Sequence, residues 1–402
     1  MINKFNKNLL KGSLILLIAF NAYNFLNFVF HFIMARMLTI AEYGVLAVLF
    51  SIIYSLGVFT ESIQTIITRY TTNEKDEGKI NDLLRKSFTK VLKPVSIIFI
   101  LYLLIAFPLS YLLKINYFLL ALTGIIIFPS FSTPITRGIM QGRKMFIPLG
   151  MNMIYESVFK LFLAVLFVWI GWKVYGAMAG VILGVSLSLF ISFFSLRKIM
   201  NSPRKKSNTL DIYNYARPTL MVMAVIIVFY SLDIILAKIF FSDEIAGTYA
   251  IASILSKTIF WGTQPIARAM FPLSAEKNNN SNKIFSNSLF MLIFMISCAL
   301  LIFFFFPDFI VYIFSGKNVP LASNILIYLG IATSILSLTN LNFMYKLSKG
   351  KIRNYYWMPI FILIEISLFW LFSSNLIEFS LSFITSSLIL LCGSIYLFDK
   401  TD

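Results

Sequence analysis

The chain has 402 residues, of which 59% are hydrophobic and only 13% are charged. Soluble domains normally carry about 25% charged residues, so this composition excludes an ordinary soluble protein and indicates a chain surrounded mainly by lipid. One bilayer crossing takes about 20 apolar residues, so the length fits about twelve crossings and leaves no room for a soluble catalytic domain. His31 is the single histidine, which excludes a metal site built from several histidines.

Apolar runs long enough to cross a bilayer follow one another along the chain. Backbone groups find no outside partner in lipid, so we expect each run to be a helix; barrel strands would alternate in polarity, and these runs do not. The first run lacks a clear cleavage site and is interpreted as an uncleaved helix rather than a signal peptide. The predicted fold is therefore an all-α integral membrane protein. Its predicted spans are 12–34, 43–68, 94–114, 117–136, 147–170, 174–196, 216–237, 246–267, 285–306, 321–344, 356–373 and 379–398.

Lysines and arginines are distributed unevenly between the segments that join these spans. With the N-terminus placed inside, the inner segments hold 27 of the 34, the outer segments hold 4, and 3 lie within spans. Excess basic residues in cytoplasmic loops are the usual topology signal, so we predict a multi-pass protein of the cytoplasmic membrane with both termini in the cytoplasm. Basic loops that face anionic inner-leaflet lipids account for the formal charge of +17 without a nucleic-acid partner.

One cytoplasmic segment, 79–93, has an apolar stripe with lysines and arginines on its other side. This pattern is typical of a short amphipathic helix. Such a helix can lie on the membrane surface or pack on the helix bundle, and the sequence leaves both interpretations open.

Two similar segments follow the first and the seventh predicted spans. Residues 35–47 read ARMLTIAEYGVLA, and residues 237–250 read AKIFFSDEIAGTYA. Each contains a small residue, a base, an acid six residues after the base, and then Gly and Ala. Because both segments follow a helix that runs from inside to outside, the halves 1–205 and 206–402 are predicted to be parallel repeats of six helices.

These two segments belong to a longer series of short motifs. The series comprises Ala35-Arg36-Met37-Leu38, Glu42-Tyr43-Gly44, Arg69-Tyr70, Arg137-Gly138, Gln141-Gly142-Arg143, Glu156, Lys160-Leu161, Gly176-Ala177, Gly180, Asp233, Leu236-Ala237-Lys238, Gly247-Thr248-Tyr249 and Pro265 to Pro272. In order and spacing the series resembles the polysaccharide flippases, a group of polysaccharide biosynthesis proteins in the multidrug/oligosaccharidyl-lipid/polysaccharide exporter superfamily. The resemblance covers nearly the whole chain, although the last two predicted helices carry little of it.

The resemblance implies two pseudo-symmetric six-helix bundles around a central cavity, and transport by alternating access rather than catalysis. The substrate it implies is an oligosaccharide linked to an isoprenoid pyrophosphate, with other polysaccharide assembly proteins as partners. An ion-coupled multidrug exporter of the same superfamily is the nearest alternative, and a membrane glycan polymerase or ligase is weakened by the short predicted outer loops. No glycine-rich phosphate loop and no hydrolytic constellation is present, so we expect neither an enzyme nor a cofactor.

Charged residues inside predicted spans are candidate site residues, because each costs about 2.5–3.5 kcal/mol at a helix centre. Lys257 lies about eleven residues into the eighth span, near the middle of the bilayer. We interpret it either as a cavity cation that attracts a pyrophosphate or acidic sugar, or as the partner of a buried acid such as Glu61. Glu61 and Gln64, in the second span, either line the cavity or pair internally.

The second and eighth spans end similarly at the inner face. Gln64 precedes Arg69 in one, and Gln264 precedes Arg268 in the other. The arginines form either a cationic mouth that receives a diphosphate or ordinary topology-setting charges.

Five further ionisable residues complete the candidates. His31 and Asp233 each lie five residues before the base of their repeat segment, and they are candidates for ion or proton coupling or for an interhelical hydrogen bond. Glu156 and Lys160 are four residues apart and are expected to pair. Glu365 has no obvious local partner.

The sixth span contains Gly176, Gly180 and Gly184, spaced every four residues. This spacing places all three on one helix face. Small residues on one face let two helix backbones approach closely, so we predict a tight helix contact along this stripe.

Overall fold

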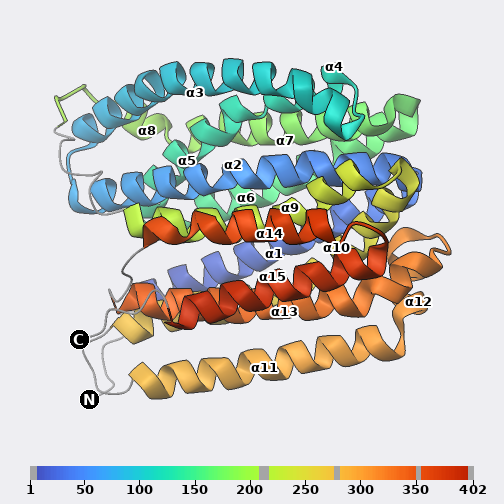
Figure 1. Cartoon of the computed structure of the whole chain (residues 1–402). Coiled ribbons are helices and arrows are strands. Elements are labelled where there is room, and N and C mark those ends of the chain that lie inside the picture. Colours follow the sequence, from blue (N-terminus) through green and yellow to red (C-terminus); the bar gives the residue numbers. More distant parts are fainter. Residues whose placement is uncertain (1–6, 208–216, 276–280, 350–354, 397–402) are drawn as a thin grey trace. The chain divides into compact units, whose positions relative to one another are not determined.

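The computed structural model describes residues 7–207, 217–275, 281–349 and 355–396 (Figure 1). Regular structure in these ranges is helical, which confirms the predicted all-α fold.

The chain forms two compact units. The first unit comprises residues 1–38 and 56–216, and the second comprises residues 39–55 and 217–402. These units differ from the predicted halves chiefly in segment 39–55, which packs within the second unit. Helix α2 (Ile40–Asn73) therefore begins in the second unit and ends in the first.

The first unit contains seven further helices and one π-helical turn. They are α1 (Lys7–Met37), α3 (Glu77–Leu113), α4 (Tyr117–Gly124), α5 (Ile127–Gly142), α6 (Phe146–Phe167), the π-helical turn Val168–Trp172, α7 (Lys173–Ser195) and the short α8 (Arg197–Met200).

The second unit is also built from long helices, of which α13 and α15 run side by side (Figure 1). Its helices are α9 (Arg217–Phe240), α10 (Asp243–Ala275), α11 (Ser281–Phe305), α12 (Pro307–Ser315), α13 (Pro320–Ser348), the 3-10 turn Tyr355–Trp357, α14 (Pro359–Leu371) and α15 (Leu376–Tyr396).

The helices correspond to the predicted spans. Among the described residues, 8 stretches are long and apolar enough to cross a membrane, and one of them, Phe146–Ser195, contains both α6 and α7. α2 and α14 contribute the shorter apolar stretches Ile40–Ser55 and Tyr355–Leu371, and α4 and α5 together fill the fourth predicted span. The predicted central cavity stays a prediction.

α6 and α7 pack closely because α7 presents the predicted glycine stripe to α6. A Cβ atom at Gly180 would lie 2.5 Å from the Cα of Ala164, and one at Gly184 would lie 2.6 Å from the backbone nitrogen of Lys160. A Cβ at Gly176 would lie 2.8 Å from the carbonyl carbon of Phe167. Real Cβ atoms do not come this close to backbone, so the predicted tight contact is confirmed.

The two repeat segments meet where the first turns of α2 and α10 cross. A Cβ atom at Gly44 would lie 2.6 Å from the Cα of Gly247, and one at Gly247 would lie 2.6 Å from the carbonyl carbon of Ile40. Tyr43, beside this crossing, is fully buried and meets Phe314 edge-on. The equivalent glycines of the two repeats are therefore each other's neighbours, and the crossing requires both.

α3 runs without a break from Glu77 to Leu113, so segment 79–93 is not a separate surface helix. Ile80, Leu83 and Leu84 are buried in a cluster that includes Ile135 and Ile139 of α5. Of the two interpretations of this segment, the structure shows the one in which the apolar stripe packs on the bundle.

The residues after α8 are fixed to the start of α3. Asp82 accepts hydrogen bonds from Arg204 (2.5 Å) and from the backbone N–H and the hydroxyl of Ser207 (2.8 and 2.7 Å). Asp76 pairs with Lys205 at 2.7 Å, and this hydrogen bond holds the pKa of the Asp76 carboxyl below its usual range. The chain is thus attached to the first unit as far as Ser207.

We expect Gly180→Ala to destabilise the protein by about 1–3 kcal/mol, the usual cost of overpacking, because the new methyl group meets the α6 backbone. Thermal unfolding of the purified protein in detergent measures this. Gly262→Ala is the matched control, since nothing lies within 4 Å of a Cβ at Gly262. Equal melting temperatures for Gly180→Ala and the wild type would contradict the packing described for α6 and α7.

Candidate functional site

A buried ion pair joins α9 to α10 in the second unit. The Nζ of Lys257 lies 2.7 Å from Oδ1 of Asp233. Lys257 exposes 3% of its surface and Asp233 exposes 0%, so both charges are removed from solvent. The Nζ of Lys257 also lies 4.6 Å from the ring centre of Tyr230, which adds a cation–π contact.

One face of α10 supplies this ion pair with further partners. Side chains four residues apart lie on the same face of a helix, and the polar face of α10 consists of Tyr249, Ser253, Lys257 and Trp261. The hydroxyl of Ser253 donates to Oδ2 of Asp233 at 2.5 Å, and that of Tyr249 donates to the same oxygen at 3.4 Å. The ring N–H of Trp261 donates to the hydroxyl of Tyr230 at 2.6 Å. Asp233 therefore receives donors from successive turns of one neighbouring helix.

A third ionisable side chain, Glu365 of α14, interacts electrostatically with both members of the pair. Glu365 is fully buried, and within the described residues neither of its carboxyl oxygens has a hydrogen-bond partner. Asp233, Lys257 and Glu365 together are called the Asp233 cluster below. The Asp233 cluster therefore brings the carboxyl groups of α9 and α14 to one lysine of α10.

The first unit holds a separate buried network around Glu156 of α6. Arg137 of α5 forms an ion pair with Glu156, in which Nη2 lies 2.6 Å from Oε2. The Nε of Arg137 also donates a hydrogen bond to Oδ1 of Asn152 at 2.8 Å. The hydroxyl of Tyr23, in α1, donates to Oε1 of Glu156 at 2.9 Å. The predicted partner, Lys160, interacts electrostatically with Glu156, but the sequence did not predict the ion pair with Arg137. The reason is that Arg137, assigned to a cytoplasmic loop from the sequence, lies within α5.

Lys257 and Asp233 are the predicted site residues that the structure brings into contact. The sequence offered Glu61 as an example of a buried acid for Lys257, whereas the acid that holds Lys257 is Asp233. The side chain of Glu61 lies outside the described residues. Glu365 was seen in the sequence as a charge without a partner, and the structure places it beside this pair.

The predicted glutamines and arginines lie on α2 and α10. The amide of Gln64 donates to Oε1 of Gln141 at 2.9 Å within the first unit. Gln264, in the second unit, has a buried Oε1 without a hydrogen-bond partner among the described residues. Arg69 and Arg268 are exposed toward the ends of their helices. A cationic mouth formed by these arginines stays a prediction.

His31, the other predicted coupling residue, is buried in α1, with 7% of its surface exposed. Its ring packs edge-on against the ring of Phe30, with the two ring centres 5.4 Å apart. His31 belongs to the first unit and Asp233 to the second. Among the described residues no group of three or more His, Cys, Asp or Glu side chains could hold a metal ion.

Comparison with known proteins places the chain in a family. Residues 9–278 match the family described as polysaccharide biosynthesis protein. A search of curated proteins found no match.

Solved structures of membrane transporters share the fold. The lipid II flippase MurJ, in an inward closed conformation, superposes with a TM-score of 0.72 at 14% identity, over 96% of this chain and 87% of that chain. The eukaryotic MATE transporter AtDTX14 superposes with a TM-score of 0.66 at 11% identity, over 97% of this chain and 96% of that chain. A MOP superfamily transporter from Pyrococcus furiosus superposes with a TM-score of 0.53 at 13% identity, over 97% of this chain and 95% of that chain. The chain therefore belongs to the polysaccharide biosynthesis protein family and shares its all-α fold with these multi-pass membrane transporters.

Proposed function

We propose that this protein flips lipid-linked oligosaccharide precursors from the inner to the outer leaflet of the cytoplasmic membrane, for surface polysaccharide biosynthesis. The observation that carries the proposal is the family match over residues 9–278, in a chain with a transporter fold. The structural similarity to a lipid II flippase supports a lipid-linked substrate. The protein would act by alternating access and not as an enzyme, with other polysaccharide assembly proteins as partners.

The proposed cycle opens a central cavity between the two halves of the chain to each side of the membrane in turn. Both termini would lie in the cytoplasm, as the distribution of basic residues predicts. An isoprenoid pyrophosphate is anionic, and the cell interior is electrically negative. Each elementary negative charge that moves outward therefore releases about 2.3 kcal/mol per 100 mV. The membrane potential can thus assist flipping without ATP.

Lys257, Arg69 and Arg268 are the proposed contacts for the pyrophosphate, with Glu61, Gln64 and Gln264 beside them in the cavity wall. Asp233 holds the ammonium group of Lys257 in the structure. A pyrophosphate oxygen would replace this carboxylate as the partner of Lys257, since phosphate oxygens accept strong hydrogen bonds from cations.

The exchange of partners gives Asp233 its proposed coupling role. If Lys257 turns to the substrate, Asp233 is left as an unpaired anion near Glu365. Two adjacent buried carboxylates favour uptake of a proton or another cation. Asp233, together with His31 in the first unit, is therefore proposed to couple transport to an ion.

A second candidate function is export of cationic compounds, because the fold is shared with MATE transporters. The Asp233 cluster has two acids against one base, and the lysine of α9, Lys238, is already paired with Asp243 at 2.5 Å. A cavity wall in which acids predominate would suit a cationic drug. A drug-susceptibility panel on cells with and without the protein separates the two functions, and glycan polymerisation by the purified protein would revive the polymerase alternative.

Deletion of the gene should strand lipid-linked oligosaccharide in the inner leaflet and reduce surface glycan, because the precursor can no longer reach the outer face. Extraction of lipid-linked precursors and surface-glycan staining measure the two effects. Normal surface glycan in a deletion strain without a paralogue would contradict the proposal.

Lys257→Met should abolish export and destabilise the protein by about 3–5 kcal/mol, because Asp233 is left as a buried unpaired charge. Export is measured by complementation of the deletion strain, and stability by thermal unfolding. The double variant Asp233→Asn with Lys257→Met is the matched control for stability.

The double variant removes both charges with similarly sized side chains, so we expect its melting temperature to return close to that of the wild type. The proposal predicts that it still fails to export, since both the substrate contact and the coupling acid are missing. Export at the wild-type rate by the double variant would show that the ion pair only stabilises the fold.

A further inference from the structure

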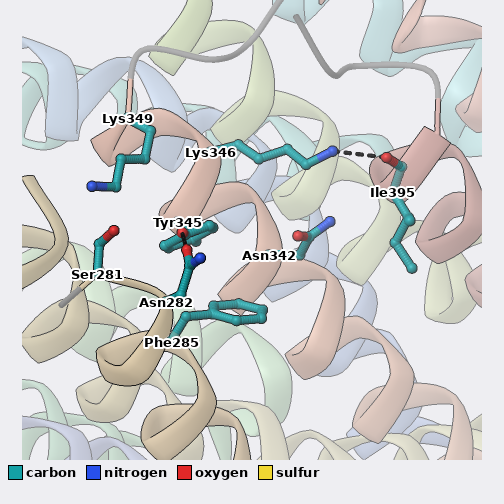
Figure 2. Close-up of a pocket in the computed structure, with 8 residues that line it drawn as sticks. All are labelled: Ser281, Asn282, Phe285, Asn342, Tyr345, Lys346, Lys349 and Ile395. Carbon is teal, nitrogen blue, oxygen red and sulfur yellow. Dashed lines mark hydrogen bonds between the residues drawn. The ribbon is translucent and has the colours of Figure 1, made fainter. Parts of the chain in front are cut away.

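A polar pocket of ≈ 420 Å³ lies in the second unit, where α11 begins and where α13 and α15 end (Figure 2). α11 contributes Ser281 and Asn282 to its wall, and the last turns of α13 contribute Tyr345, Lys346 and Lys349. None of the residues used above for the proposed function lines this pocket.

The pocket is electropositive, because two of the described residues that line it are lysines and none is an acid. Lys346 is buried, and its Nζ donates to the carbonyl oxygen of Ser394 at 2.6 Å. It also donates to the carbonyl oxygen of Ile395 at 2.9 Å (Figure 2). It therefore satisfies the last turn of α15 and adds positive charge to the wall. The ammonium group of Lys349 has neither a hydrogen bond nor an ion pair within the described part of the chain. Lys349 is thus available to an anion.

Hydrogen-bond donors complete the wall. The hydroxyl of Tyr345 donates to Oδ1 of Asn282 at 2.7 Å, which leaves the amide N–H₂ of Asn282 as a donor. Ser281 adds a hydroxyl group.

The surroundings of the pocket are those of a lipid rather than of a soluble anion. Phe285 and Ile395 form an apolar part of its wall. Further along α11, Phe290, Met291 and Phe294 expose 74%, 58% and 63% of their surfaces. A headgroup in the pocket would therefore have an apolar helix surface beside it for its acyl chains.

We infer that this pocket binds the phosphate headgroup of an anionic phospholipid from the cytoplasmic leaflet, with the acyl chains along α11. Lys349, the amide of Asn282 and the hydroxyl of Ser281 hold the phosphate, and Phe285 contacts the upper part of the chains. The inference rests on the proposed orientation, which places these helix ends at the inner leaflet. It does not depend on which substrate the protein transports.

The test measures lipid retention by native mass spectrometry. The full-length protein is released from nanodiscs that contain equal amounts of phosphatidylglycerol and phosphatidylethanolamine. We expect wild-type protein to retain phosphatidylglycerol preferentially, and Lys349→Gln to retain about fivefold less, since one lysine near an anionic surface contributes about 1 kcal/mol. Lys283→Gln is the matched control, because Lys283 is exposed in the same first turn of α11 but does not line the pocket.

Three results would overturn the inference: equal retention of both lipids by the wild type, unchanged retention by Lys349→Gln, or an equal loss in Lys283→Gln. A second arm adds inorganic phosphate to the purified protein. A melting temperature raised by phosphate as much as by phosphatidylglycerol would assign the pocket to a soluble anion instead. Export in the deletion strain is scored separately, so a failure of lipid binding is distinguishable from a failure of the proposed transport function.

Discussion

A charge buried in a helix bundle that spans lipid needs a partner from another helix, because neither water nor lipid can supply one. In this protein such pairs connect helices. Asp233 and Lys257 join α9 to α10 at 2.7 Å, and Arg137 and Glu156 join α5 to α6 at 2.6 Å. Any movement that separates one of these helix pairs must provide a new partner for each charge. A transport cycle in which substrate and a coupling ion replace the members of the Asp233 cluster meets this requirement directly.

The second constraint is the close approach of helix backbones. Gly44 and Gly247, from the two repeat segments, face one another where α2 crosses α10, and Gly180 brings α7 against α6. Both contacts exclude even a methyl group. Because these helices touch through backbone, they are held in register. The contact between Gly44 and Gly247 therefore fixes α10, which carries Lys257, against the first turns of α2.

Much of the fold follows from the sequence, because hydrophobic run length and residue spacing are local properties. The helical spans and the contact along Gly180 were predictable for that reason. The partner of Lys257 was not, although the sequence contains the signal that Tyr249, Ser253, Lys257 and Trp261 share one face of α10. Spacing within a helix tells which residues share a face, but not which neighbouring helix that face meets. For the same reason the sequence placed Arg137 in a loop, whereas it is half-buried within α5 and paired with Glu156.

Transport by the purified protein tests the central claim most directly. Proteoliposomes that carry a fluorescent isoprenoid pyrophosphate oligosaccharide are assayed by the fraction of label accessible to a quencher outside the vesicles, with and without a membrane potential. The account predicts rapid exchange of the labelled lipid between leaflets, faster when the potential drives the anionic headgroup in the direction of transfer. Exchange no faster than in protein-free vesicles, with the protein folded and inserted, would contradict it.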